Sequence, residues 1–199
     1  MWDRDARADD GIEPSYGRIA GDATLVVGAG VTVASSGPRA AGELRLRYLD
    51  TAGLFVAYED GVLLGGGTRP ARLFAAGFEL RPLFLFRWLR GHETHCPRLD
   101  LMLDSLGLEL GATLPQDPGG SFASAPGLQA GLGIEVPIGE TADGPWIGLH
   151  GGVRMGDDVL ASGSSAQSEE DRELYLSITL AWHEVILLHA VDVGDLPPQ

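Results

Sequence analysis

Hydrophobic and polar residues alternate along much of this chain, most regularly over residues 127–138, which read GLQAGLGIEVPI. Successive side chains of an extended strand point to opposite faces. One face of this stretch would carry leucine, isoleucine, valine and alanine, and the other would carry glycine, glutamine, glutamate and proline. The pattern therefore predicts an amphipathic strand.

The same alternation recurs about every ten residues, with turn residues in between, which is the pattern of a transmembrane β-barrel. The other predicted strands are residues 16–34, 43–48, 54–59, 72–81, 106–114, 146–156 and 173–183. We therefore expect an all-β fold, an antiparallel up-and-down transmembrane β-barrel of eight strands. Ten strands are the alternative, because residues 82–105 fit either strand or short helix.

The barrel is expected to occupy residues 16–183 of the 199-residue chain. Residues 1–15 are polar and acidic, which predicts a flexible N-terminal arm, and residues 184–199 form a tail with a proline-rich end. No signal peptide is recognisable at the start, so an exported protein would already have lost it.

Charges of both signs lie on the polar face of the predicted strands. An unpaired buried charge is strongly destabilising, so charges in a narrow barrel interior must pair. The apolar face is rich in leucine and aromatic residues and the polar face is rich in glycine, which favours a polar interior and an apolar exterior. The predicted interior network contains Arg18, Asp22, Glu43, Arg45, Arg47, Glu79, Arg81, Glu109, Glu135 and Arg154, with Arg87 and Asp100 from the uncertain middle segment.

The net charge of −14 excludes nucleic acid as an expected partner, because phosphate binding requires a basic surface. We expect membrane lipid to surround the barrel and the protein to be a monomer without a cofactor. The sequence indicates no particular protein partner, solute or ligand.

The strand pattern over residues 16–183 resembles the small outer-membrane β-barrels, such as the OmpA transmembrane domain and OmpX. It is also similar to predicted outer-membrane proteins of myxobacteria. The resemblance implies an eight-stranded barrel in the outer membrane of a Gram-negative bacterium, structural or narrow-pore in type. It also implies short periplasmic turns and longer outer loops.

Five histidines and one cysteine are the candidates for chemistry. His92, His95 and Cys96 are weak candidates for a metal site, since one segment supplies all three and the HExxH spacing is absent; we expect a polar loop instead. His150 and His183 lie on the predicted interior face, where they are either a proton-sensitive gate or hydrogen-bonded interior side chains.

No catalytic motif is present, so we expect no enzyme activity. Ser177 and His183 share a face, but six residues of strand separate them by about 20 Å. Two alternatives stay open: a soluble barrel that binds an apolar ligand, and a membrane-embedded lipid-modifying enzyme. Six aromatic residues near strand ends are expected to form interfacial girdles: Tyr16, Tyr48, Tyr58, Trp88, Trp146 and Trp182.

Overall fold

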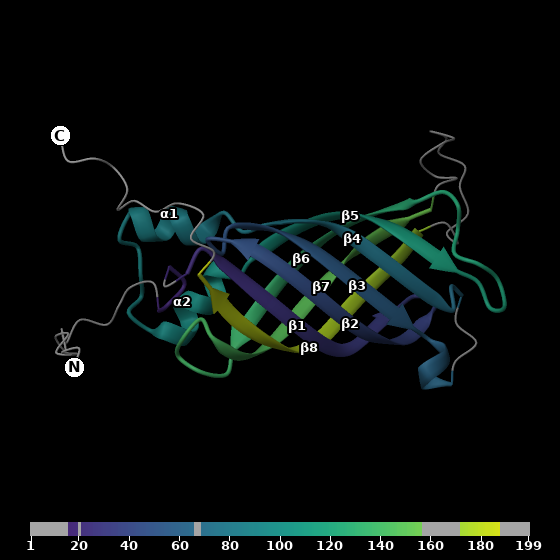
Figure 1. Ribbon diagram of the computed structural model, residues 1–199, viewed down its shortest axis with the longest axis horizontal. Coiled ribbons are helices and arrows are strands. Elements are labelled where there is room, and N and C mark those ends of the chain that lie inside the picture. Colours follow the sequence, from purple (N-terminus) through teal and green to yellow (C-terminus); the bar gives the residue numbers. More distant parts are fainter. Residues whose placement is uncertain (1–15, 20, 66–68, 157–171, 188–199) are drawn as a thin grey trace.

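The computed structural model describes residues 16–19, 21–65, 69–156 and 172–187. Eight antiparallel strands close into a barrel in sequence order (Figure 1). The strands are β1 (Ala23–Ala34), β2 (Gly37–Tyr48), β3 (Ala52–Asp60), β4 (Arg72–Leu80), β5 (Gly107–Gln116), β6 (Gly127–Pro137), β7 (Gly144–Met155) and β8 (Arg172–Ile186). This confirms the predicted all-β, eight-stranded, up-and-down barrel.

The barrel closes because β1 pairs with both β2 and β8. Val27, for example, lies opposite Leu44 on one side and Trp182 on the other. Closure leaves no unpaired sheet edge, which removes the main route by which sheets associate with one another.

Three short helices accompany the strands: η1 (Val62–Leu64), α1 (Leu83–Leu89) and α2 (Pro97–Asp104). The last two occupy the ambiguous segment 82–105, so that segment is helical and adds no strand. Neither of these helices, nor any other in the part of the chain that the structure describes, has the length and apolar character needed to span a membrane.

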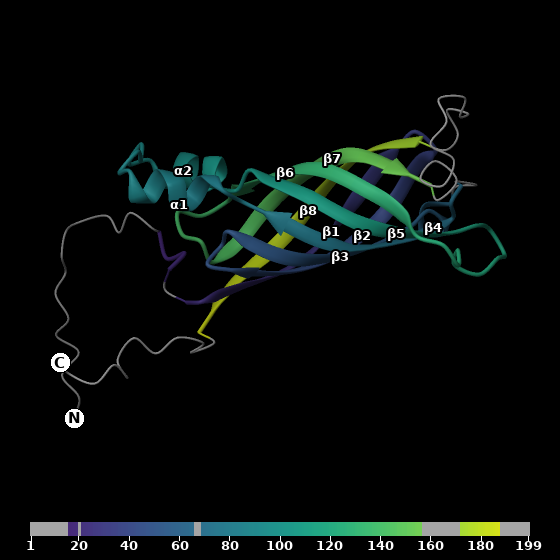
Figure 2. The same ribbon diagram turned by 90° about the horizontal axis from the view of Figure 1, so that it is seen from above.

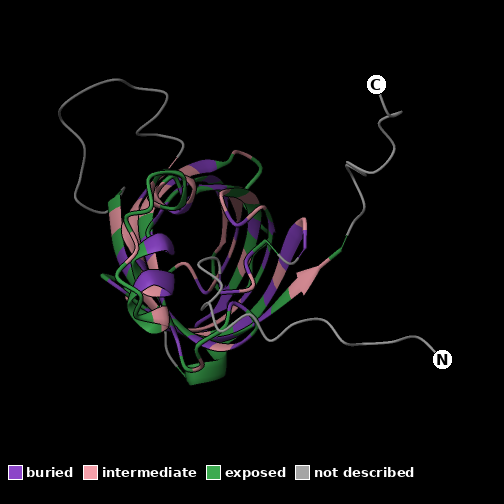
Figure 3. Ribbon diagram, turned by 90° about the vertical axis from the view of Figure 1, so that its left-hand side faces the viewer, coloured by how far each residue is buried: buried purple, intermediate pink, exposed green. Residues whose placement is uncertain are grey.

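The two ends of the barrel differ. At one end β1 begins and β8 ends, and α1 and α2 lie beyond the strands; we call it the capped end (Figures 1 and 2). Figure 3 looks onto the capped end, with the helices in front of the barrel. The opposite end carries the β1–β2, β3–β4 and β5–β6 connections, and we call it the loop end.

Side-chain burial follows the predicted faces, with charge inside and hydrophobic groups outside. Glu135 and Arg47 are 0% and 1% exposed, whereas Leu132 and Leu176 are 56% and 46% exposed. Outward positions of the strands carry charge only near strand ends, at Asp60, Arg72, Arg172 and Glu184. An interior apolar patch of Phe55, Leu73 and Ala75 interrupts the polar lining.

Two expectations are wrong at the capped end. The first strand begins at Ala23, and residues 16–19 form a turn ahead of it. Tyr16 and Trp146 are only 6% and 2% exposed and pack together with Leu101 of α2, so they belong to an interior cluster and to no girdle. The other four aromatic residues are at least 36% exposed. At the other end of the chain β8 continues to Ile186, so the predicted end of the barrel at residue 183 and start of the tail at residue 184 are wrong. The predicted arm (1–15) and residues 188–199 of the tail lie outside the described residues.

Candidate functional site

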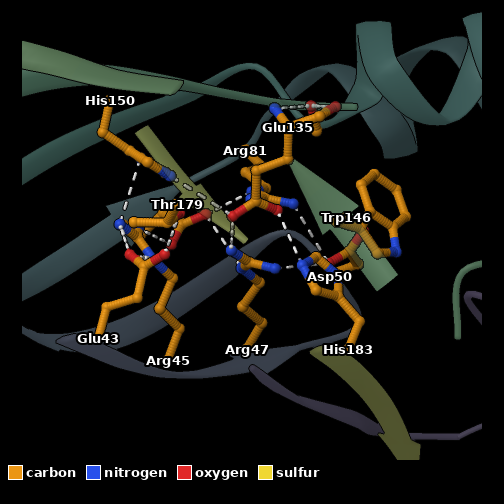
Figure 4. Close-up of polar contacts among 12 residues, drawn as sticks. Glu43, Arg45, Arg47, Asp50, Arg81, Glu135, Trp146, His150, Thr179 and His183 are labelled. Carbon is orange, nitrogen blue, oxygen red and sulfur yellow. Dashed lines mark hydrogen bonds and ion pairs between the residues drawn. The ribbon is translucent and has the colours of Figure 1, made fainter. Parts of the chain in front are cut away.

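Arg45 of β2 is the centre of the charge network inside the barrel (Figure 4). Its Nη1 donates to Glu79 Oε2 at 2.8 Å and to Glu109 Oε1 at 2.6 Å. Its Nε and Nη2 donate to Glu43 Oε2 at 2.9 and 2.8 Å. One buried guanidinium thus joins carboxylates from three strands, using the fork of donors that distinguishes arginine from lysine.

Glu135 of β6 forms the next layer toward the capped end. It accepts from Arg47 Nη2 at 2.8 Å, and its other oxygen lies 2.6 Å from Arg81 Nη2. Both arginines also donate to Glu79 Oε1. A tight turn, with Leu49 and Asp50 at positive φ, places the Asp50 carboxyl 3.6 Å from Arg81 Nη1.

The arginines do not balance the carboxylates when these two layers are taken together. Three arginines face five carboxylates. We call these eight side chains the central cluster: Arg45, Arg47, Arg81, Glu43, Asp50, Glu79, Glu109 and Glu135. Burial of Asp50 raises its pKa above the ordinary value even though Arg81 and Arg47 lower it. Loss of an arginine would increase the excess of carboxylates, so each arginine is harder to replace than any single carboxylate.

Both predicted interior histidines contact this cluster. His150 Nδ1 lies 2.8 Å from Glu109 Oε1, and His183 Nε2 lies 3.3 Å from Glu135 Oε2. His183 also stacks on Trp146, with ring centroids 4.5 Å apart and planes 6° apart. His150 is therefore hydrogen-bonded through Nδ1, whereas His183 Nε2 lies within ion-pair distance of Glu135 without making a hydrogen bond.

The histidine contacts do not assemble a nucleophile and base. Ser177 lies opposite His150 in the β7–β8 register. His150 Nδ1 is engaged with Glu109, and its Nε2 faces Glu135 Oε1 at 3.7 Å. His183, which the sequence placed on the same face as Ser177, contacts the Glu135 layer instead.

A second group of buried charges, the loop-end cluster, consists of Arg39, Glu59, Arg154 and Glu173. Arg154 Nη2 donates to Glu59 Oε1 at 2.6 Å, and Arg39 Nη1 donates to Glu59 Oε2 at 3.1 Å. Both arginines also reach Glu173. Gln129 and Thr32 add hydrogen bonds. Two arginines balance two carboxylates here.

Of the loop-end cluster, only Arg154 belongs to the network predicted from the sequence. Arg39 lies ahead of the predicted strand 43–48, and Glu59 and Glu173 are the terminal residues of the predicted strands 54–59 and 173–183, which were not counted among the interior residues. Arg39 has the same parity as Glu43 and Arg45 on β2, so extending the alternation back through Pro38 would have found it. The alternation of faces was enough to place these residues inside the barrel, and the error was to end the interior faces before the ends of the strands.

A cavity of about 30 Å³ lies between the two clusters. Glu43, Glu109, Arg154 and Tyr175 are among its lining residues. A cavity of this size holds only a few water molecules. The interior of the barrel is therefore filled by its own side chains.

A third group of charges fixes the two helices to the capped end. Asp100 of α2 accepts from Tyr16 Oη at 2.8 Å, from Thr94 N at 3.0 Å and from Arg87 Nη2 of α1 at 2.5 Å. Asp104 accepts from Arg18 Nη1 at 2.7 Å and from Arg87 Nη1 at 2.6 Å. We call these five side chains and Thr94 the cap cluster. It ties α1, α2 and the segment before β1 together.

The cap cluster corrects part of the predicted network. Arg18 was expected on the first strand, but it lies in the preceding turn and pairs with α2. Asp22 is half-buried at the start of the barrel, outside the central and loop-end clusters. The remaining eight predicted network residues are buried inside the barrel. Arg87 and Asp100 pair with each other, but on helices.

The weak metal candidates His92, His95 and Cys96 are exposed in the connection between α1 and α2. Across the described ranges, no group of three or more histidine, cysteine, aspartate or glutamate side chains is arranged to hold a metal ion.

Comparison with known proteins adds no family to this description. No protein-family model matches the chain, and no curated protein is significantly similar to it. What defines the protein is its architecture: a closed eight-stranded barrel with an ionic interior and an apolar wall.

Replacement of Arg45 tests the central cluster. Arg45→Met should lower the free energy of unfolding by about 3–5 kcal/mol, because removing one partner of buried ion pairs leaves uncompensated charge. The measurement is urea unfolding followed by tryptophan fluorescence. The matched control is Arg69→Met on the exposed surface, which should change little. Equal effects of the two substitutions would contradict the role of Arg45.

The cap cluster should depend on pH. Burial alone would raise the pKa of Asp100, but hydrogen bonds from Thr94, Tyr16 and Arg87 lower it below its ordinary value. Burial and the Asp100 carboxylate raise the pKa of the Tyr16 hydroxyl. A lowered acid pKa gives stability that is present above the unfolded value of about 3.9 and lost as pH falls through the folded value. A raised tyrosine pKa gives stability that is fully present below the unfolded pKa of about 10 and is lost as the pH rises above that value.

We therefore expect the cap to be ordered from about pH 4 to about pH 10 and to loosen outside that window. The measurement is the mobility of a spin label on Cys96, the chain's single cysteine, which is exposed between the two helices. Asp100→Asn should remove most of the loosening in acid. An unchanged acid response in that variant would show that another group controls the cap.

Proposed function

We propose that this protein is a β-barrel of the bacterial outer membrane, structural in role and closed to solutes, with a charge-paired interior. The observation that carries the proposal is the inverted polarity of the barrel. Fully buried arginines and glutamates fill the interior, while the outward strand positions are uncharged except near strand ends.

Inverted polarity favours lipid over water as the surrounding solvent. A water-soluble monomer rarely exposes a contiguous apolar surface larger than a few hundred Å². Here exposed leucine, isoleucine, valine and aromatic side chains occur on all eight strands. A soluble barrel with an apolar ligand inside would instead need an apolar interior, and the interior patch of Phe55, Leu73 and Ala75 is small.

The backbone supports the same conclusion. In lipid every backbone polar group must find a partner within the protein, which only helices and closed barrels achieve. All eight strands pair on both sides, and the pairing of β1 with β8 completes the closure. The proposed location agrees with the resemblance of the strand pattern to the OmpA transmembrane domain and OmpX.

A closed interior follows from the number of strands and the size of the side chains. Eight strands enclose a space just wide enough for side chains to fill. The central cluster and the loop-end cluster occupy this space, and the cavity between them measures about 30 Å³. With no room for a substrate beside Ser177 or His150, the proposal includes no catalytic activity.

The lipid-facing assignment is tested on the outer wall. Leu132→Arg and Leu176→Arg should each oppose insertion into lipid vesicles by about 2–4 kcal/mol near the bilayer midplane. Insertion is measured by co-flotation with vesicles and by protection from added protease. Asp117→Arg, at an exposed position of the loop end, adds the same side chain and should insert like the parent.

If both leucine variants insert as well as the parent, the wall does not face lipid. A parent protein that stays monodisperse in buffer without detergent would also overturn the membrane proposal.

The closed interior is tested by recording current across a planar bilayer. The parent should give no stable, porin-like steps. Arg154→Ala should raise the frequency of small current events, because it removes a guanidinium beside the cavity, while Arg69→Ala should not. Large, stable conductance in the parent would require an open interior and a transport role.

A further inference from the structure

The two helices at the capped end repeat the inverted polarity of the barrel. Their charged side chains Arg87, Asp100 and Asp104 point inward and form the cap cluster. The opposite side of the helix pair is hydrophobic and exposed, with Leu89 at 74% and Phe86 at 51%. Leu99 and Leu103 of α2 are further members of this outer face, and Trp88 borders it on the side of Phe84. A cap surrounded by water would place these groups the other way round.

The outer face continues the apolar wall of the barrel. β4 ends at Leu80, which is 49% exposed, and α1 begins three residues later at Leu83. α2 leads through Leu106 into β5, whose first outward residue, Leu108, is 53% exposed. Figure 1 shows α1 and α2 lying beyond the ends of these strands. Exposed hydrophobic residues therefore stand on both sides of each connection between the strands and the helices.

Arginines border this outer face. The guanidinium carbon of Arg90 lies 4.7 Å from the centre of the Phe86 ring, and Arg90 and Arg98 are both exposed. Such side chains place their methylene groups on apolar surface and keep the charge in the polar layer. Tryptophan and arginine beside leucine and phenylalanine are the composition of a helix in a lipid headgroup layer.

We propose that the outer face of the α1–α2 pair binds the phospholipid headgroup layer next to the rim of the barrel. Phe86 and Leu89 enter the boundary between headgroups and acyl chains, and Arg90 and Arg98 contact lipid phosphates. The inference rests on the proposed membrane location and deepens it. It assigns the capped end to a phospholipid leaflet and makes lipid contact part of what holds the cap in place.

Three single-cysteine variants separate the two proposals. Each is made in Cys96→Ser protein, because the chain has no other cysteine. Leu89→Cys reports on the outer face of the helices, Leu132→Cys on the barrel wall and Asp117→Cys on the exposed loop end. All three positions are more than one-third exposed, so a small environment-sensitive fluorophore should not disturb packing.

The labelled proteins are placed in vesicles of phosphatidylethanolamine and phosphatidylglycerol. One quencher is a nitroxide attached to the lipid, near the headgroup to report on Leu89 and Asp117 and near the end of the acyl chain to report on Leu132, and the other is iodide in the water. We expect the Leu89 label to be quenched by the nitroxide at least threefold more than the Asp117 label, and to be protected from iodide. Replacing Arg90 and Arg98 by glutamine should reduce the nitroxide quenching of the Leu89 label, and more so at higher phosphatidylglycerol content.

The outcomes distinguish the two proposals. If the Leu132 label is quenched by the nitroxide and the Leu89 label is open to iodide, the barrel is in the membrane but the helices do not bind lipid, and the inference is wrong. That result would leave the outer face free for a protein. If neither label is quenched by the nitroxide, the membrane location itself fails, and the inference fails with it.

Discussion

Ion pairing in the interior is the interaction on which the rest of this structure depends. Several of the paired side chains are fully buried or nearly so, among them Arg39, Arg47, Arg81 and Glu135. Each such charge would be strongly destabilising alone, because desolvation of an ion costs several kcal/mol even after the protein relaxes. Arg45 and Glu79 bridge strands that are far apart in the sequence, so the network can form only when the barrel closes. Pairing is thus a condition for closure as well as a result of it.

The alternation of residues was enough to predict the fold. Alternation with a period of two determines which side chains share a face, and its recurrence along the chain indicates the number of strands. It could not place partners within the interior. Arg47 reaches Glu135 across the barrel from β2 to β6, and no local pattern encodes that distance. The pattern also failed at Tyr16 and Arg18, where polar and apolar residues alternate without forming a strand. Their partners Asp100 and Asp104 are on α2, 84 and 86 residues further along the chain.

The helical segment was ambiguous for a physical reason. Residues 83–89 are apolar at nearly every position, which suits a strand buried on both sides or a helix with one face in a core and the other exposed. The structure uses the second solution, with Phe84 buried under the Arg18 guanidinium and Leu89 exposed. Periodicity alone cannot separate these two cases, since both faces are hydrophobic.

The two interior clusters differ in a way that matters for how the barrel is held closed. The loop-end cluster is balanced, with Arg39 and Arg154 sharing Glu59 and Glu173, so loss of one arginine leaves the other on both carboxylates. The central cluster has more carboxylates than arginines, and of the described residues only Arg45 among the arginines pairs with Glu43 or Glu109. The loop end should therefore be the more tolerant part of the interior. Arg47 and Arg81 share Glu79 and Glu135, so the arginine that has no substitute in the central cluster is Arg45, and closure of the barrel depends on it most.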